Sequence, residues 1–236
     1  MFARSLFSLA LTLVVSASLC VAAPTLKMDA SGTGCHEYVI IDSRGTNEHA
    51  GLSYAFAGMV KETLAALPGG IELANPYPAD WSSGSPSAGA NFISSYIKNG
   101  LAACPSQKYA LLGWSQGAAV SQMGVAQVMR DAPDAADLVA AVLLVGNPFR
   151  TPGRLGNVDE HGTPNGPTDA LTGMMAGNYP ASMGTLASHD KVLDICYTSD
   201  FVCGSHGHDG SAHGKYGGDA HVQHMGAQFL IARLGA

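Results

Sequence analysis

The sequence predicts an α/β fold, a single-domain, three-layer sandwich in which helices cover both faces of a central, mostly parallel sheet of about five strands. Short apolar runs alternate along the chain with longer segments of helical periodicity, which is the pattern of repeated strand–helix–strand units. The apolar runs are nearly continuous, as expected for strands buried on both faces. The 236 residues contain no internal repeat and no linker, so we expect one domain.

The first half of the chain begins this alternation. Residues 36–42 (HEYVIID) predict a buried strand, and residues 71–74 predict a short second strand. Between them, residues 54–67 predict a helix that stops at Pro68-Gly69-Gly70, because neither proline nor glycine favours a continuing helix. A turn-rich segment follows the second strand, and another helix is expected over about 88–101.

The second half continues in the same order. It predicts strands at 109–112, 138–145 and 192–197 and helices at 116–130 and 221–234. Residues 149–191 are rich in glycine and proline and have weak periodicity. A structureless loop of that length is unusual in a compact domain, so we expect this segment to be functional or to contain short helices.

The amino terminus has the features of a secretion signal. Arg4 supplies a positive charge, residues 6–15 are apolar, and small residues follow, so we expect a signal peptide over about 1–22. A membrane anchor is the alternative, but the apolar run is shorter than the ~20 residues that a spanning helix needs. Residues 23–34 then form a short leader, and the domain spans 35–236. We expect a secreted, extracellular protein without stable membrane insertion.

The charge balance argues against a nucleic-acid partner. The formal net charge is −6, and no basic run offers contacts to phosphates. Removal of the signal, with one arginine and no acidic residue, makes the charge more negative. Charged residues make up only 13% of the chain, against roughly 25% in typical soluble proteins. This composition suits a surface that meets apolar, insoluble material, or simply a small, compact fold rich in alanine and glycine.

The cysteine count indicates disulfides. Cys20 lies in the expected signal, and four cysteines remain in the domain: Cys35, Cys104, Cys196 and Cys203. An even count in an exported chain predicts two disulfides, for which three pairings are possible. A zinc site is disfavoured because no pair has the C-x2-C spacing.

A candidate nucleophile follows the strand at 109–112. Gly113-Trp114-Ser115-Gln116-Gly117 fits G-x-S-x-G in its expected context of strand, sharp turn and helix. At such a turn the serine backbone is strained, and the two flanking glycines remove collisions where strand and helix nearly touch. The unpaired N–H groups at the start of the helix favour negative charge on a carbonyl under attack. The alternative is a plain Gly/Ser turn, since the pattern also occurs by chance.

A serine nucleophile needs a base and an acid that orients the base, expected in the chain order Ser, Asp, His. Asp200 follows the last predicted strand, at the edge where Ser115 should lie, inside the short loop that Cys196 and Cys203 would close. A loop that short is better explained as a clamp on a catalytic loop than as a global staple. The other acidic candidates are Asp190 and Asp194, which are weaker, and Asp209.

The base is harder to assign, because five histidines follow Asp200. They are His206, His208, His213, His221 and His224. Their density suggests a metal site, but the H-x-H at 206–208 is flanked by glycines and lacks a rigid element to set coordination geometry, so an exposed polar loop explains it better. His221 and His224 are three apart on the closing helix and fit its surface. Position alone favours the loop 205–214 without choosing a residue.

Taken together, these segments resemble the cutinase family of secreted serine esterases, especially the fungal cutinase-like enzymes that act on polyesters. The resemblance covers about 35–234 and rests on four segments in order. They are C-H-E-Y with S-R-G-T-N-E (35–38 and 43–48), Cys104-Pro105 with G-W-S-Q-G-A (113–118), V-L-D-I-C through D-F-V-C (192–203) and A-H-G-K-Y-G (212–217). Trp114 stands where family members often have tyrosine.

The resemblance implies an α/β-hydrolase-like (cutinase-like) fold and assigns roles to these residues. Ser115 attacks the ester carbonyl, His213 transfers the proton, and Asp200 orients the imidazole. The N–H groups of Thr46 and Gln116 form the oxyanion hole.

The resemblance also implies that Cys35 pairs with Cys104 and Cys196 with Cys203, with no metal and no cofactor. We therefore expect a monomeric carboxylic ester hydrolase acting on cutin-like polyesters and short- to medium-chain acyl esters. The alternatives are an acetylxylan esterase, a lipase with a mobile lid, and a secreted binding module that has lost catalysis.

Overall fold

A computed structural model describes residues 34–164, 166, 170–176, 183–204 and 207–236. Residues 35–236 form one compact unit. The expected signal peptide at 1–22 lies outside the described residues, as does the leader apart from its last residue.

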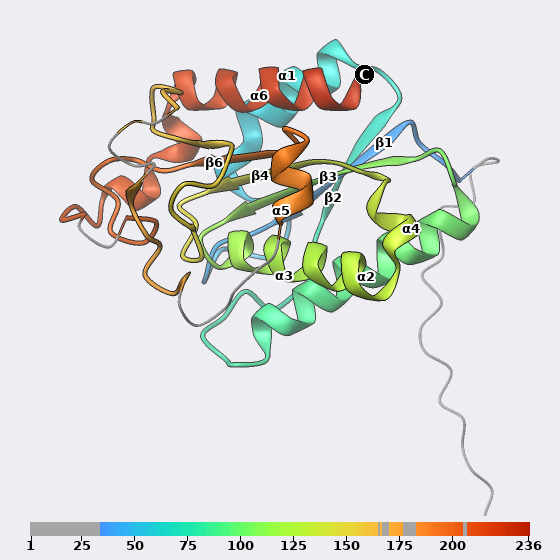
Figure 1. The fold of residues 1–236 in the computed structure, drawn as a ribbon, viewed down its shortest axis with the longest axis horizontal. Coiled ribbons are helices and arrows are strands. Elements are labelled where there is room, and N and C mark those ends of the chain that lie inside the picture. Colours follow the sequence, from blue (N-terminus) through green and yellow to red (C-terminus); the bar gives the residue numbers. More distant parts are fainter. Residues whose placement is uncertain (1–33, 165, 167–169, 177–182, 205–206) are drawn as a thin grey trace, which may run out of the picture. The chain divides into compact units, whose positions relative to one another are not determined.

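The core of this unit is a sheet of six parallel strands in the order β2-β1-β3-β4-β6-β5 (Figure 1). The strands are β1 (Tyr38–Ser43), β2 (Gly70–Ala74), β3 (Lys108–Trp114), β4 (Val139–Val145), β5 (Asn157–Val158) and β6 (Val192–Ile195). All five pairings between neighbouring strands are parallel. The predicted α/β class is therefore confirmed, although the sheet has six strands instead of about five.

Helices cover both faces of the sheet (Figure 1). Within the described ranges, the α-helices are α1 (Ala57–Ala66), α2 (Ser85–Ala103), α3 (Gln116–Asp131), α4 (Pro133–Ala136), α5 (Gly184–Ser188) and α6 (Ala220–Leu234). The 3₁₀ helices that are described in full are η1 (Tyr54–Phe56), η4 (Ala212–Gly214) and η5 (Tyr216–Gly218). One buried cluster joins the sheet to α1 and α6, and a second joins its other face to α2, α3 and α5.

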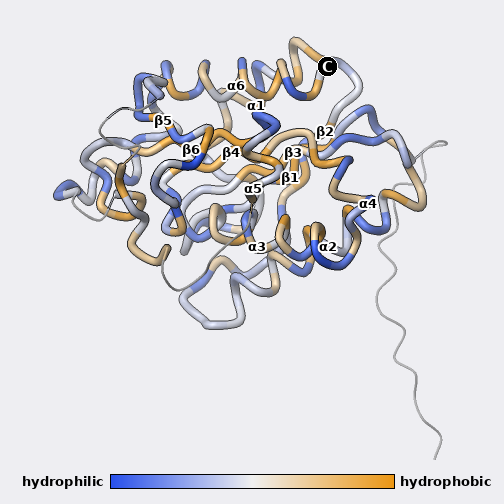
Figure 2. The backbone as a smooth tube through the Cα atoms, viewed as in Figure 1, coloured by the Kyte–Doolittle hydropathy of each residue, from blue (hydrophilic) through white to orange (hydrophobic). Residues whose placement is uncertain are grey.

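Burial of the central strands explains their composition. Every residue of β1 and β4 is buried. The sequence of β4 is accordingly apolar on both faces (VAAVLLV), and β1 is apolar over its first four residues, with Asp42 and Ser43 buried at its carboxyl end. Figure 2 shows this pattern, with hydrophobic residues concentrated in the strands and on the inward sides of the helices. The polar connections lie outside this core.

The segment 149–191 contains a strand, β5, that sequence periodicity did not predict. Its strand β5 has two residues and pairs with the outer side of β6. Arg150 links β5 to β6. Its guanidinium is fully buried, contacts Asp194 Oδ1 at 3.0 Å and donates to the carbonyl oxygens of Asp194 (2.6 Å) and Val158 (3.5 Å). Arg154 also pairs with Asp194. Part of the expectation of short helices is met by α5, and the rest of the segment lies partly outside the described residues.

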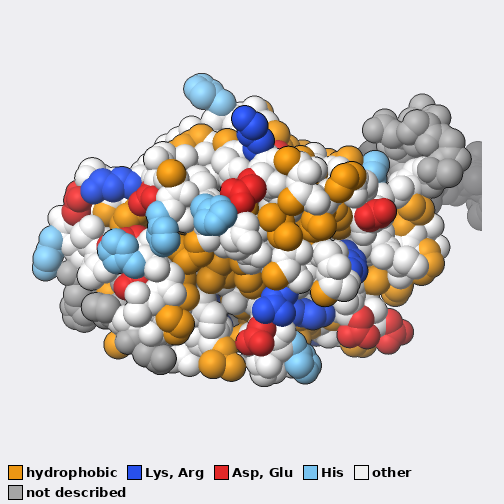
Figure 3. Space-filling view, turned by 90° about the horizontal axis from the view of Figure 1, so that it is seen from above, with side chains coloured by type: hydrophobic (Ala, Val, Ile, Leu, Met, Phe, Trp, Pro, Cys, Tyr) orange, Lys and Arg blue, Asp and Glu red, His pale blue; other side chains and the backbone are white. Residues whose placement is uncertain are grey.

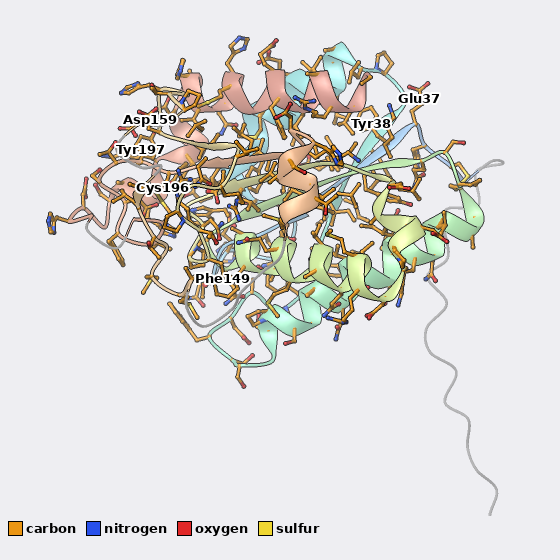
Figure 4. The ribbon with its side chains drawn as sticks, in the orientation of Figure 1. Glu37, Tyr38, Phe149, Asp159, Cys196 and Tyr197 are labelled. Carbon is orange, nitrogen blue, oxygen red and sulfur yellow. A yellow bond between two sulfur atoms is a disulfide. The ribbon has the colours of Figure 1, made fainter. Side chains whose placement is uncertain are left out.

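Because all strands are parallel, their carboxyl ends share one edge. The labelled side chains of Cys196 and Tyr197 lie at this edge, at the opposite end of the sheet from Glu37 and Tyr38 (Figure 4). We refer to it as the carboxyl edge. The connections after β1, β3, β4 and β6 all leave from it, so residues far apart in sequence can meet there.

Candidate active site

Ser115 occupies the turn between β3 and α3. Its backbone has φ 56° and ψ −118°, a strained conformation for a residue with a side chain. A Cβ atom on Gly113 would lie 2.2 Å from the carbonyl oxygen of Gly117, and one on Gly117 would lie 1.9 Å from the carbonyl oxygen of Ser43. Both glycines are therefore required by close backbone approach, as expected for a nucleophile elbow. The Ser115 hydroxyl makes no hydrogen bond with any described residue and is half-buried.

Thr46 lies in the connection after β1, and Gln116 is the first residue of α3, directly after Ser115. The backbone N–H groups of these two residues donate no hydrogen bond within the described part of the chain. The Gln116 side chain links the two loops, because its Nε2 donates to Thr46 Oγ1 at 3.2 Å and to the carbonyl of Asp80 at 2.8 Å. Its Oε1 accepts from Ser85 Oγ at 3.0 Å. Two unpaired backbone N–H groups thus belong to segments that a side-chain bridge joins, and one of them directly follows Ser115.

The loop that carries Thr46 is braced by Glu48. The Glu48 carboxylate accepts from the N–H of Gly45 at 2.6 Å, from Ser53 Oγ at 2.9 Å and from the N–H of Tyr54 at 3.1 Å. Arg44 Nη1 donates to the Glu48 carbonyl at 2.6 Å. Because charge-assisted hydrogen bonds are the stronger kind, these contacts fix the loop conformation around Thr46. Sequence reasoning included Glu48 in a motif without assigning this role.

Asp200 and His213 are joined by a hydrogen bond of 2.8 Å between Asp200 Oδ2 and His213 Nδ1. The Asp200 side chain is fully buried, whereas the His213 side chain keeps 17% exposure. Two further donors hold the carboxylate: the N–H of Val202 contacts Oδ1 at 2.8 Å, and the Tyr216 hydroxyl contacts Oδ2 at 2.7 Å. Burial and the nearby Asp200 carboxylate raise the pKa of Tyr216 well above its usual value, so its hydroxyl stays a donor.

The other acidic candidates occupy different places. Asp194 is fully buried in the ion pairs with Arg150 and Arg154, and its Oδ2 also accepts from Asn147 Nδ2 at 2.7 Å. Asp190 is exposed. Asp209 is partly exposed and faces Lys215 at 3.4 Å. The ion pairs of Asp194 could not be predicted from the sequence, because Arg150 and Arg154 lie in a connection without periodicity.

The other histidine candidates do not contact Asp200 within the described residues. His208, His221 and His224 are exposed, and His224 pairs with Glu62 at 2.9 Å. His206 lies outside the described residues. Nowhere in the described ranges do three or more His, Cys, Asp or Glu side chains gather as a metal site.

The imidazole of His213 packs against the residue that lies beside Ser115. The N–H of Ser115 donates to the carbonyl of Val145 at 3.1 Å, so the next residue, Gly146, lies at the elbow. A Cβ atom on Gly146 would be 2.7 Å from His213 Cε1. With Nδ1 bound to Asp200, the opposite nitrogen, Nε2, is the one available to accept a proton at this edge.

The structure contains disulfides between Cys35 and Cys104 and between Cys196 and Cys203, with Cα–Cα distances of 5.5 and 5.9 Å. The second pair encloses Asp200 in a small ring. Its Cys203 sulfur also lies 3.5 Å from the Tyr216 hydroxyl. The ring therefore constrains both the carboxylate and one of its donors.

Two further properties concern membranes and nucleic acids as partners. No described helix has both the length and the apolar character required to cross a membrane. On the face formed by α1 and α6, the Lys and Arg side chains are scattered (Figure 3).

Comparison with known proteins places this geometry in a family. Residues 34–234 match the Cutinase family. The fold is similar to that of a cutinase-like protein from Cryptococcus sp., with 36% identity, a TM-score of 0.77, and coverage of 86% of this chain and 97% of that one. Carboxylesterase Culp1 of Mycobacterium tuberculosis is 29% identical over 204 residues, covering 85% of this chain and 83% of that protein.

An acetylxylan esterase shares the fold at 22% identity and a TM-score of 0.69, over 85% of this chain and all of that one. The match to the family spans nearly the whole described unit, including the edge that carries Ser115, Asp200 and His213. The chain therefore belongs to the cutinase family, and it is an esterase.

Proposed function

We propose that the chain is a secreted serine carboxylesterase in which Ser115, His213 and Asp200 form a catalytic triad. The observation that carries the proposal is the 2.8 Å hydrogen bond from His213 Nδ1 to the buried Asp200 carboxylate, at the edge where Ser115 occupies a strained turn. Asp200 stabilises the imidazolium that forms during reaction and keeps the proton on Nδ1.

The reaction proceeds through an acyl-enzyme. Ser115 Oγ attacks the ester carbonyl carbon while His213 Nε2 takes the hydroxyl proton. The tetrahedral intermediate places its oxyanion between the N–H groups of Thr46 and Gln116, and loss of one such donor typically costs ~2.7–4 kcal/mol of transition-state stabilisation. The C–O bond then breaks, and the leaving alcohol takes the proton from His213. Water attacks the acyl-enzyme in the same way and releases the carboxylic acid.

The exposed apolar side chains support a water-insoluble ester substrate. Among the described residues, the exposed large apolar side chains lie in connections that contact the carboxyl edge, with one exception. The exception is Leu155, because the next residue, Gly156, lies against Val192 at the amino end of β6. We call the six side chains at the carboxyl edge the apolar rim: Leu52, Tyr54, Trp81, Met174, Met175 and Phe201. Trp81 is 82% exposed. Apolar surface gathered around one edge marks a site for apolar material, which fits cutin-like polyesters and acyl esters of short to medium chain length.

Export is supported by the sequence of residues 1–22 and by the two disulfides, which persist in oxidising compartments. All the residues proposed for catalysis come from one chain, so the function requires no second copy, and we expect a monomer.

The test is a nitrophenyl ester series, from acetate to long-chain esters, run on the wild type and on Ser115→Ala. We expect hydrolysis of butyrate and longer esters by the wild type, and a fall of at least about 10³-fold in kcat/KM for the variant. Labelling by a fluorophosphonate should require Ser115. A folded wild type that is neither labelled nor active would contradict the proposal. Strict preference for acetate would replace the polyester with an acetylated polysaccharide.

The apolar rim has its own test, because a soluble ester reaches the serine without docking. Trp81→Ala should slow release of products from a polyester film more than hydrolysis of nitrophenyl butyrate. Equal effects on the two substrates would remove Trp81 from the docking surface. Ser115→Ala serves as the control, since it should abolish both activities.

A further inference from the structure

The turn that carries His213 is too short to provide hydrogen-bond donors for all of its own backbone carbonyl groups. η4 has three residues, and a helix that short leaves its last carbonyls without partners inside the element. The carbonyl of Ala212 accepts from the N–H of Lys215 at 3.1 Å, and that of Lys215 accepts from the N–H of Gly218 at 3.0 Å. The two carbonyls between them, those of His213 and Gly214, need donors from elsewhere.

Two aromatic side chains supply those donors. Trp114 Nε1 donates to the carbonyl of His213 at 3.0 Å, and the Tyr54 hydroxyl donates to the carbonyl of Gly214 at 3.0 Å. Burial, with the Glu48 carboxylate nearby, raises the pKa of Tyr54, so its hydroxyl remains protonated at neutral pH. The donors come from 99 and 160 residues away in the chain.

The two rings also contact each other and the rest of the site. Their centroids lie 4.9 Å apart in an edge-on arrangement with an interplanar angle of 76°. The indole of Trp114 lies 5.5 Å from the imidazole of His213, centroid to centroid. It also covers Gly45, where a Cβ atom would lie 2.3 Å from Trp114 Cε3. Trp114 thus touches the residue before Thr46 as well as His213.

We propose that Trp114 and Tyr54 are positioning residues, which hold His213 within reach of Ser115 by donating to consecutive carbonyls of its turn. This inference rests on the proposed function, because it assigns a role to residues around the proposed base. Asp200 orients the imidazole ring, whereas the two aromatic donors fix the backbone from which that ring projects. Neither Trp114 nor Tyr54 takes part in proton transfer.

The first test needs no turnover. The chain has two tryptophans, Trp81 and Trp114, so the indole region of a ¹⁵N–¹H spectrum contains two signals, and Trp81→Phe assigns them. Trp81 is 82% exposed and serves as an internal reference. We expect the Trp114 indole N–H to exchange with water at least about tenfold more slowly than that of Trp81. Equal exchange rates of the two indole N–H groups in the folded protein would refute the hydrogen bond from Trp114 to the turn of His213.

The second test measures catalysis. Trp114→Phe and Tyr54→Phe each remove one donor and keep an aromatic ring, and we expect each to lower kcat about three- to tenfold with KM unchanged. Because both act on one turn, the double variant should lose less than the product of the single losses. Folded single variants that keep wild-type kcat, or that change KM alone, would refute the positioning role.

The matched control is Tyr109→Phe. It removes a buried tyrosine hydroxyl, bonded to Gln107 Nε2 at 2.8 Å, at the opposite end of β3 from Ser115. It should lower thermal stability and leave kcat unchanged, which separates positioning from general destabilisation. If the wild type is no more active than Ser115→Ala, the proposed function fails, while the indole exchange rate still decides whether Trp114 is bound as described.

Discussion

The two disulfides close rings of very different size, and their removal is expected to affect stability and activity in opposite order. The bond between Cys35 and Cys104 joins residues 69 positions apart, at the amino end of the sheet. The bond between Cys196 and Cys203 joins residues seven apart and encloses Asp200. The perturbation is the double alanine variant of each pair.

The stability difference follows from loop-closure entropy. For the larger ring of 70 residues, the entropy restored to the unfolded chain corresponds to ~4.4 kcal/mol of unfolding free energy, and for the ring of eight residues to ~2.5 kcal/mol. Loss of the larger ring should therefore lower the urea midpoint further. Cys196 and Cys203 are both fully buried, so their replacement by alanine also leaves a cavity. The cost of this cavity adds to the entropic loss for the smaller ring and reduces the difference in stability between the two variants.

Activity should follow the opposite order, because only the small ring touches the site. Its residue Asp200 accepts from His213, and Cys203 lies against the Tyr216 hydroxyl that also holds Asp200. Without the ring the carboxylate loses part of its positioning. A displacement of about 1 Å in such a group can cost on the order of 10²-fold in rate.

The assay is kcat on nitrophenyl butyrate at a temperature where urea titration finds both variants folded. We expect the small-ring variant to lose far more kcat than the large-ring variant, although it is the more stable of the two. Equal losses of kcat, or a small-ring variant with wild-type kcat, would refute the reasoning that this disulfide constrains the catalytic loop.

Three further predictions concern single residues. Tyr216→Phe removes a hydrogen bond to the buried Asp200 carboxylate and should cost ~1.5–3 kcal/mol of stability by urea unfolding and lower kcat. Gly117→Ala forces a Cβ to 1.9 Å from a backbone carbonyl at the end of β1 and should destabilise by ~3 kcal/mol or more, whereas Gly84→Ala, with nothing within 4 Å, should change the melting temperature little. Burial, together with nearby carboxylates, raises the pKa of Asp42 well above its usual value, so the folded state holds this proton to higher pH than the unfolded chain does. Stability should therefore fall as pH rises from about 4 through the folded pKa, and urea titrations from pH 4 to 8 should find that Asp42→Asn makes this slope shallower.

Features encoded by neighbouring residues were predicted from the sequence. The helix at 116–130 and the strand at 138–145 agree with α3 and β4 to within a residue. The elbow at Ser115 could also be predicted, because strand, glycines and helix all lie within a few positions of it. Residues 54–67 correspond to η1 followed by α1, so the predicted extent was right while the first turn is a tighter helix.

Features built by contacts across the chain could not be predicted. β5 has two residues and no periodicity, and it depends on Arg150, whose partner Asp194 is 44 residues away. The sequence likewise placed Tyr216 in a motif but gave no reason for its hydroxyl to reach Asp200. The donors to the histidine turn have the same origin, since Trp114 and Tyr54 approach it only after the sheet has formed.

The strand order explains why the proposed triad of Ser115, His213 and Asp200 also needs Gly146. Ser115 follows β3 and Asp200 follows β6, and β4 lies between them, so the two connections start about 10 Å apart at ~4.8 Å per strand. A carboxylate cannot span that distance to a hydroxyl, and an imidazole lying over the end of β4 can. That position must be free of a side chain, because a Cβ atom on Gly146 would meet His213 Cε1 at 2.7 Å, and its φ of 57° also favours glycine. In the proposed triad, the histidine therefore bridges the two connections over the glycine that directly follows β4, which makes the stretch Gly146-Asn147-Pro148 part of the site.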